Sequence, residues 1–167
     1  LTAAYARLKS GMGYYKQQFM PTLFASSDQG LSTYLYNEFK RGIVTSTNQS
    51  LNNLWKELYL GIREANNVIA NVPEIEMDEE LKNRIIGEAK FLRALHYFNL
   101  VRCFGEVPLR TTPVEAGDDQ GLAVSSIVEI YDSIIDDLNY ASLHCWGRNE
   151  SRGNYINDLG RATNTSA

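Results

Sequence analysis

The amino-acid sequence predicts an all-α fold. Three long segments place apolar residues three and four positions apart, the spacing of one face of a helix, and no segment alternates apolar and polar residues as a half-buried strand does. Hydrophobic residues make up 44% and charged residues 22% of the 167 residues, the composition of an ordinary folded protein. A chain of this length can bury its own core, so we expect one helical domain over residues 1–167.

The clearest helix begins at Leu51. Pro73 ends it, because proline disfavours helical geometry in the residue before it and has no backbone N–H to donate. Upstream, residues 13–50 are punctuated by glycine and proline and predict loops with short helical turns, after a short first helix that carries Leu1, Tyr5, Leu8 and Met12. The apolar face of the long helix consists of Leu51, Leu54, Trp55, Leu58, Tyr59, Ile62, Ala65 and Ile69.

A second helix is expected from about Asp78 to Phe104. Glu80 and Arg84 stand four residues apart and are expected as an ion pair on the solvent side of its first turns. From Phe91 onward apolar residues surround the axis, Phe98 and Cys103 among them, so this half should be buried between other helices. Gly105 can adopt the positive φ that ends a helix, and the stretch 105–124 predicts a loop.

A third helix should follow Ser126, which forms a capping-box pattern with Glu129, and should end near Leu143. We expect the aspartates at 132, 136 and 137 on its solvated face and Cys145, just after its end, to be accessible. Residues 160–163 resemble the opening of another helix, which suggests that the natural chain continues. The expected inner face consists of Ile127, Ile130, Tyr131, Ile134, Leu138 and Ala141.

The sequence offers little for catalysis or for nucleic-acid binding. Its 16 basic and 20 acidic residues give a net charge of −4, which disfavours a phosphate backbone as partner. No hydrolase, metalloprotease, phosphate-loop or dinucleotide motif occurs, and we expect no metal site, no cofactor and no catalytic residue. His96 reads as a buried core histidine, and His144 as a favourable charge at a helix C-terminus.

The most specific signal is a series of motifs between Leu54 and Leu109. On these motifs the chain resembles the SusD/RagB family, and the later segments Ile130-Tyr131 and Gly160-Arg161-Ala162-Thr163 are similar to the next family signatures in the same order. The motifs are Leu54-Trp55, Ala65-Asn66-Asn67-Val68-Ile69, Gly87-Glu88-Ala89-Lys90-Phe91-Leu92-Arg93-Ala94, Tyr97-Phe98-Asn99-Leu100-Val101 and Phe104-Gly105-Glu106-Val107-Pro108-Leu109.

The resemblance implies a fold, a function and a location. Family members are surface-exposed lipoproteins of the outer membrane, built on tetratricopeptide-like helix pairs, and they are not enzymes. They capture oligosaccharides or other nutrients and deliver them to a TonB-dependent SusC-like transporter. By resemblance this chain is the N-terminal helical portion, so the later ligand-binding part and the lipid anchor that attaches the protein to the membrane lie outside it.

Candidate ligand contacts lie in the loop-rich stretch before Trp55. Tyrosine offers a flat apolar face for a sugar ring and asparagine offers hydrogen bonds, so we single out Tyr34, Tyr36, Asn37 and Asn48. The charged residues Glu88 and Arg93 lie within helix motifs and should form structural salt bridges or hydrogen bonds at helix ends.

Other functions stay open at this point. A helical-repeat scaffold for protein partners would show the same helix pairs, and some family members bind peptides instead of glycans. A helical glycoside hydrolase would need two carboxylates across a cleft, and no spacing in the sequence supports the pair Asp28 and Glu38 for that role.

Overall fold

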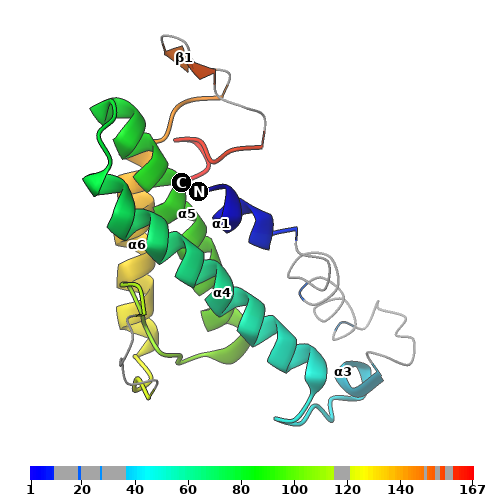
Figure 1. Cartoon of the computed structure of the whole chain (residues 1–167). Helices are drawn as coiled ribbons and strands as arrows, with labels where there is room; N and C mark the ends of the chain where they lie inside the picture. The colour runs from blue at the N-terminus through cyan, green and yellow to red at the C-terminus, as the bar shows by residue number, and fades with distance from the viewer. Residues whose placement is uncertain are drawn as a thin grey trace. The chain divides into compact units, whose positions relative to one another are not determined.

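The all-α prediction is confirmed. The computed structural model describes residues 1–9, 19, 27, 37–114, 121–148, 150–152, 155–156 and 160–167, and in this part of the chain helices dominate (Figure 1). The only described sheet is a two-residue antiparallel hairpin with Ser151 opposite Ile156. In chain order the elements are α1 (Thr2–Arg7), α3 (Asn37–Arg41), α4 (Gln49–Asn71), the 3-10 helix η3 (Val72–Glu74), α5 (Glu79–Phe104), α6 (Ile127–His144), β1 (Ser151–Arg152) and β2 (Tyr155–Ile156).

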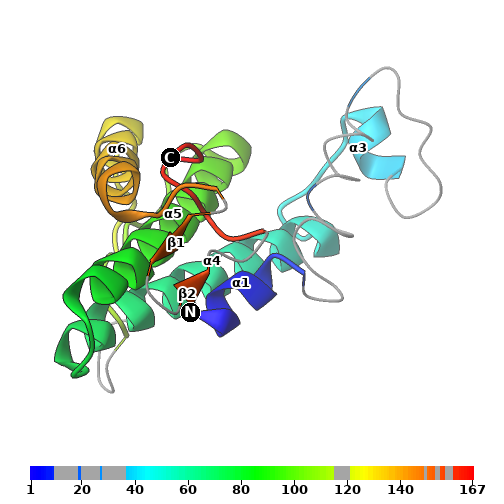
Figure 2. The ribbon, with the colours of Figure 1, turned by 90° about the horizontal axis from the view of Figure 1, so that it is seen from above.

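The contacts divide the chain into two compact units. One covers residues 2–60 and the other covers residues 61–167 together with Leu1, so the boundary falls inside α4. In the first unit Leu54 and Leu58 of α4 are fully buried. Arg7 lies 4.0 Å from Glu57, which places α1 beside the first part of α4 (Figure 2). The predicted first helix is therefore present, although Met12 lies outside the described residues.

Two helices, α5 and α6, form the centre of the second unit and pack side by side (Figure 1). Side chains from α4, α5 and α6 fill the core of this unit, and the described chain after α6 adds Cys145, Trp146 and Ala162. The largest fully buried hydrophobic side chains of the second unit are Ile62, Leu92, Tyr97, Leu100, Val107 and Ile130.

Helix α5 begins and ends almost where the sequence predicts. The Asp78 side chain accepts a hydrogen bond from the Leu81 backbone N–H at 3.0 Å, and Gly105 ends the helix with a φ of 73°. The prediction that the second half of α5 is buried on all sides is wrong at Phe98, which is 38% exposed. The Arg102 guanidinium lies 5.0 Å from the centre of this ring. A cation above an aromatic face lets that ring remain at the surface.

The capping box of α6 is confirmed. Ser126 accepts from the Glu129 backbone N–H at 3.3 Å, and the Glu129 carboxylate accepts from the Ser126 N–H at 2.8 Å. The predicted inner face is wrong at Ile127 and Tyr131, which are 44% and 37% exposed. The helix is rotated toward Asp137, whose carboxylate is buried, so residues on the other side of the stripe turn to solvent.

The chain after α6 folds back onto α5. Cys145 and Trp146 are buried, so the expected accessibility of Cys145 is wrong. Gly87 makes this return possible, because a β-carbon there would already approach the Cys145 sulfur to 3.2 Å. Residues 160–167 form turns and not the predicted helix opening, while Ala162 packs against Cys145 in a small apolar cluster.

A second glycine, Gly61, lets α4 approach α5, and it carries a prediction. A β-carbon at this position would overlap the imidazole ring of buried His96. Gly61→Ala should therefore lower the free energy of unfolding by about 1–3 kcal/mol, the range of overpacking in a dense core. Urea denaturation of the single variants and of Gly61→Ala/His96→Ala tests the cause, since the double variant should cost less than the sum of the two. Strict additivity would contradict the predicted overlap.

Candidate functional site

The structure describes only part of the predicted ligand site. Tyr34 and Tyr36 lie outside the described residues, as does Asp28, and Asn37 is the first residue of α3. Asn48 serves as the cap of α4, because its side-chain oxygen accepts hydrogen bonds from the backbone N–H groups of residues 50 and 51 at 2.9 and 3.1 Å.

The Asn48 amide also ties the start of α4 to α3. Its nitrogen donates to the Glu38 carboxylate at 2.6 Å. Both polar ends of Asn48 are therefore used within the protein, and the Glu38 carboxylate is held by an amide. Together these two residues fix the junction between α3 and α4 at the edge of the predicted ligand stretch.

The buried guanidinium of Arg93 makes four hydrogen bonds. Its Nε and Nη2 atoms donate to the two oxygens of Asp137 at 2.7 and 2.8 Å, a bidentate ion pair between α5 and α6. Its Nη1 atom donates to the Asn66 side chain of α4 and to the backbone oxygen of Thr111, both at 2.8 Å. One side chain thus joins three helices and a loop.

Further hydrogen bonds from Asn66 and from Tyr97 hold the loop after α5. The Asn66 nitrogen donates to the backbone oxygens of Arg110 and Thr112 at 3.0 and 3.1 Å. The Tyr97 hydroxyl donates to the oxygen of Arg110 and accepts from its N–H, at 2.9 and 2.7 Å. We call Asn66, Arg93, Tyr97 and Asp137 the Arg93 cluster.

The Arg93 cluster corrects the expectation for Asp137. The sequence places all three aspartates of α6 on the solvated face, and Asp132 and Asp136 are indeed exposed. Asp137 is only 3% exposed and also accepts from Lys90 at 3.1 Å. A carboxylate can take an inner helix position when a cation from the facing helix meets it there, and helix periodicity alone does not reveal that cation.

A second buried ion pair centres on Glu88, which is fully buried. It accepts from Arg84 Nε, four residues earlier on α5, at 2.9 Å and from Arg161 Nε at 3.0 Å. The Arg84 guanidinium lies 4.1 Å from the ring centre of Trp146. Structural roles for Glu88 and Arg93 are therefore confirmed, whereas the solvent position expected for Arg84 is wrong because this residue is only 3% exposed.

Burial sets the protonation states of His96 and Cys145. Burial lowers the pKa of His96 to about 4, so its imidazole is neutral at physiological pH. Burial, with a smaller contribution from the Glu88 carboxylate, raises the pKa of Cys145 to about 12, so its sulfur stays a thiol. Within the described ranges no three His, Cys, Asp or Glu side chains gather to hold a metal ion, and no helix there is long and apolar enough to cross a membrane.

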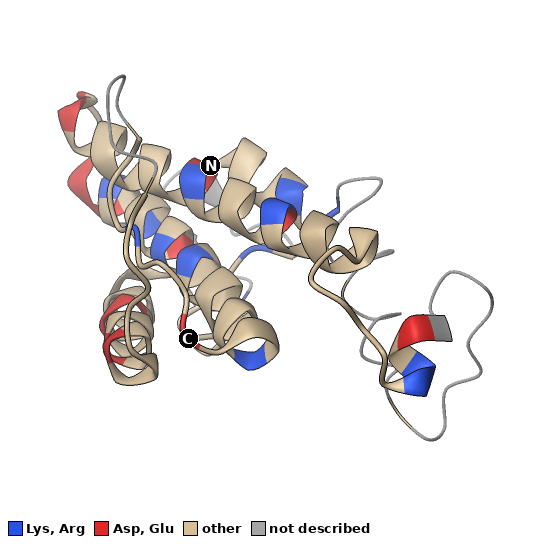
Figure 3. Ribbon diagram, turned by 90° about the horizontal axis from the view of Figure 1, so that it is seen from below, with Lys and Arg blue, Asp and Glu red and all other residues tan. Residues whose placement is uncertain are grey.

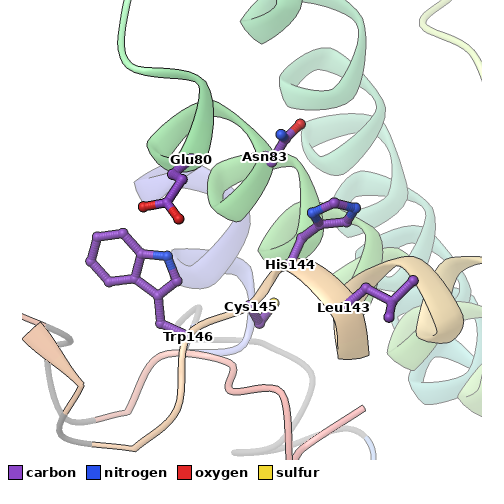
Figure 4. Close-up of a pocket in the computed structure, with 6 residues that line it drawn as sticks. All are labelled: Glu80, Asn83, Leu143, His144, Cys145 and Trp146. Carbon is purple, nitrogen blue, oxygen red and sulfur yellow. The ribbon is translucent and has the colours of Figure 1, made fainter. Parts of the chain in front are cut away.

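A small pocket lies where α5 begins and α6 ends. Its volume is about 130 Å³, below the range of roughly 300–1,000 Å³ that holds ligands of drug size, so it is too small for an oligosaccharide. Sequence reasoning missed it, because its two halves lie about 60 positions apart and share no motif. Figure 4 shows Glu80 and Trp146 on one side, His144 and Leu143 on the other, and Cys145 between them. The lining consists of Glu80, Asn83, Leu143, His144, Cys145 and Trp146.

Fold and site together define a helical-repeat protein of the tetratricopeptide-like class. The SusD-like family described as "Starch-binding associating with outer membrane" matches residues 2–145, and the chain therefore belongs to the SusD-like family.

Individual proteins that are similar to this chain also belong to the SusD-like group. SusD-like protein P25 of Formosa agariphila is 32% identical over 102 residues, which cover 60% of this chain and 19% of that protein. A laminarin-binding SusD-like protein of known structure is 31% identical, has a TM-score of 0.76, and matches 98% of this chain and 37% of its own. A protein crystallised with xylogluco-oligosaccharide is 28% identical, with a TM-score of 0.79 over 97% of this chain and 31% of its own. The chain thus spans between 19% and 37% of the length of these relatives.

The Arg93 cluster generates a stability prediction. Arg93→Met should lower the free energy of unfolding by about 3–5 kcal/mol, because it leaves the Asp137 carboxylate buried with one cation fewer. Arg93→Met/Asp137→Leu should cost clearly less than the sum of the two single variants, since no unpaired buried charge remains. Urea denaturation of the four proteins measures this coupling. Additive costs would show that the pair does not act as a unit.

A second prediction concerns pH and His96. The imidazole of the folded protein takes up its proton only near pH 4, whereas the unfolded chain takes it up near 6.5. Between these values the unfolded state binds more protons. The contribution of this group to the free energy of unfolding is therefore fully present above about pH 6.5 and falls by roughly 3 kcal/mol toward pH 4.

His96→Gln supplies the comparison for this pH effect. Urea denaturation at pH 7, 5.5 and 4.5 should show a smaller loss of stability for His96→Gln than for the natural protein. His144→Gln, which removes the other of the two histidines, is the control, and the loss that comes from His96 should remain in it. Equal pH profiles for His96→Gln and the natural protein would contradict the assignment.

Proposed function

We propose that this protein captures glycans at the bacterial surface and passes them to a TonB-dependent SusC-like transporter. The observation that carries the proposal is the likeness of 98% of the chain to a laminarin-binding SusD-like protein at 31% identity. The second relative, crystallised with xylogluco-oligosaccharide, supports an oligosaccharide ligand. The family description supports a location at the outer membrane, where a lipid anchor outside this chain would hold the protein on the cell surface.

Within this proposal residues 1–167 are the N-terminal helical domain of a longer protein. The share of the relatives that the chain matches, 19% in one case and 31–37% in the two others, supports this division. The buried ion pairs of Arg93 and Glu88 support a structural role for these residues in the domain, because both pairs lie inside the helix packing. Binding alone, without catalysis, is the activity we propose.

The proposed ligand-site residues of this domain are Tyr34, Tyr36, Asn37 and Asn48. The tyrosines would offer aromatic faces to pyranose rings, and Asn37 a hydrogen bond. Asn48 would hold the stretch in place without contacting the ligand itself, because its amide already caps α4 and binds Glu38. Sugar sites of this kind are shallow and wet, which suits a protein that must release its ligand onward.

A glycan-array assay on the full-length protein tests the proposal. We expect specific binding to one class of polysaccharide, with affinity reduced up to about tenfold per lost stacking contact in Tyr34→Ala/Tyr36→Ala. Tyr131→Ala is the matched control, since this exposed tyrosine lies on α6. Asn48→Ser, which keeps a capping side chain, should leave folding intact.

The remaining outcomes discriminate between the alternatives. Binding of peptides and of no glycan would replace the oligosaccharide with a peptide ligand. A protein partner without any small ligand would identify a helical-repeat scaffold. Glycan binding that is unchanged in the double tyrosine variant would move the site out of the loop-rich stretch before Trp55.

A further inference from the structure

Helix α6 carries a second apolar face, which the described chain leaves exposed. Its first apolar face is buried and consists of Ile130, Ile134 and Ala141. The second face consists of Ile127, Val128, Tyr131 and Ile135, which are 44%, 68%, 37% and 52% exposed. We call these four residues the outer face of α6. Single apolar side chains are normal at a surface, but four that share one side of a helix form a contiguous patch, and such a patch marks an interaction site.

The two apolar faces together are wider than one neighbouring helix covers. At about 100° per residue they occupy roughly half of the circumference of α6, whereas the apolar stripe of an ordinary surface helix is about 100° wide. Helix α5 packs along one side of α6, and α6 lies at the edge of the second unit (Figures 1 and 2). The outer face therefore has the width and the place of a contact with one further helix.

The charge of α6 defines the chemistry of that further helix. Within its 18 residues α6 contains four acidic residues and no lysine or arginine, as Figure 3 shows. Asp132 and Asp136 are exposed along the edge of the outer face, and neither forms an ion pair with a basic residue in the described part of the chain. A neighbour with lysine or arginine beside its own apolar stripe would complement these carboxylates.

A second copy of the chain does not meet this requirement. When two α6 helices pair in antiparallel directions about a two-fold axis, the same edge of each helix meets the other. Asp132 and Asp136 would then face the carboxylates of the other copy, and like charges brought together across an interface are unfavourable. The charge pattern thus favours a helix of different sequence.

The remainder of the same polypeptide is in the right place to supply that helix. The matched relatives are covered over only 19–37% of their length, so most of each relative lies outside the match. Near the end of α6, Ala162 packs against Cys145, and the Asn164 N–H donates to the Trp146 oxygen at 3.4 Å. Polypeptide that continues from these residues begins beside the C-terminal end of α6. A short connection lets it run back along α6 as an antiparallel neighbour.

We propose that the outer face of α6 is covered by an amphipathic helix of the same polypeptide, from the part of the full-length protein that follows residue 167. Its apolar stripe would pack on Val128 and Ile135, and basic residues beside the stripe would bind Asp132 and Asp136. This proposal rests on the division proposed above, in which residues 1–167 are the N-terminal domain of a longer protein. It does not depend on which ligand that protein binds.

Thiol labelling of the full-length protein tests whether the face is covered. Val128→Cys and Ile135→Cys should react with a maleimide at least about tenfold more slowly than Glu79→Cys, because a covered thiol reacts only after local opening. Glu79 is the control position, since 76% of its side chain is exposed. Mass spectrometry of peptides separates these sites from Cys103 and Cys145, and thermal melting confirms that each variant is folded. Equal labelling rates at positions 135 and 79 would overturn the proposal.

Photo-cross-linking identifies what covers the face. A benzophenone side chain placed at position 128 or 135 of the full-length protein should cross-link within one molecule. The linked segment should follow residue 167 and carry apolar residues three and four positions apart, with lysine or arginine beside them. Links between two molecules, links confined to residues 1–167, or a linked segment without basic residues would each contradict the proposal.

Glycan binding by the same variants keeps the two proposals apart. Labelling at position 135 as fast as at position 79, with glycan binding intact, would defeat the covering helix and leave the proposed function standing. A protected position 135 in a protein that binds no glycan would defeat the proposed function and leave the covering helix standing.

Discussion

The second compact unit depends on one buried cation. Arg93 uses three nitrogen atoms to bind Asp137, Asn66 and the backbone oxygen of Thr111, so α4, α5, α6 and a loop meet at a single guanidinium. A buried charge is tolerated only when its hydrogen bonds are satisfied, and a planar group with five N–H donors admits few arrangements of its acceptors. This directional requirement sets the register of the three helices more narrowly than apolar packing does.

The electrostatics of the described chain serve architecture. Glu88 sits between Arg84 and Arg161, Asp137 sits between Arg93 and Lys90, and the pKa of His96 is lowered by burial. Catalytic sites, in contrast, bring perturbed groups to a cleft where a substrate can reach them. The four buried charged residues of the described chain, Arg84, Glu88, Arg93 and Asp137, all form ion pairs within the helix packing.

Helix periodicity and end signals predicted the elements well, because they act within a few residues. Asp78, Gly105 and the Ser126 capping box define helix ends through local bonds, and the structure places the ends there. The errors fall where partners are distant in sequence. Helix periodicity places Asp137 at the surface because it does not reveal the ion pair with Arg93. Cys145 was expected to be accessible because the sequence does not show that the chain packs back against Gly87. The pocket combines residues from the start of α5 with residues at and after the end of α6, and these share no motif.

The loop after α5 is held by its backbone. Asn66, Arg93 and Tyr97 all reach carbonyl oxygens or the N–H of residues 110–112, and every residue type supplies that carbonyl. The side chains at positions 111 and 112 can therefore change without loss of these bonds, whereas Asn66 and Arg93, which hold them, cannot. Relatives with the same helical framework can differ at this loop without losing its position, so new surface chemistry can arise there with little effect on the fold.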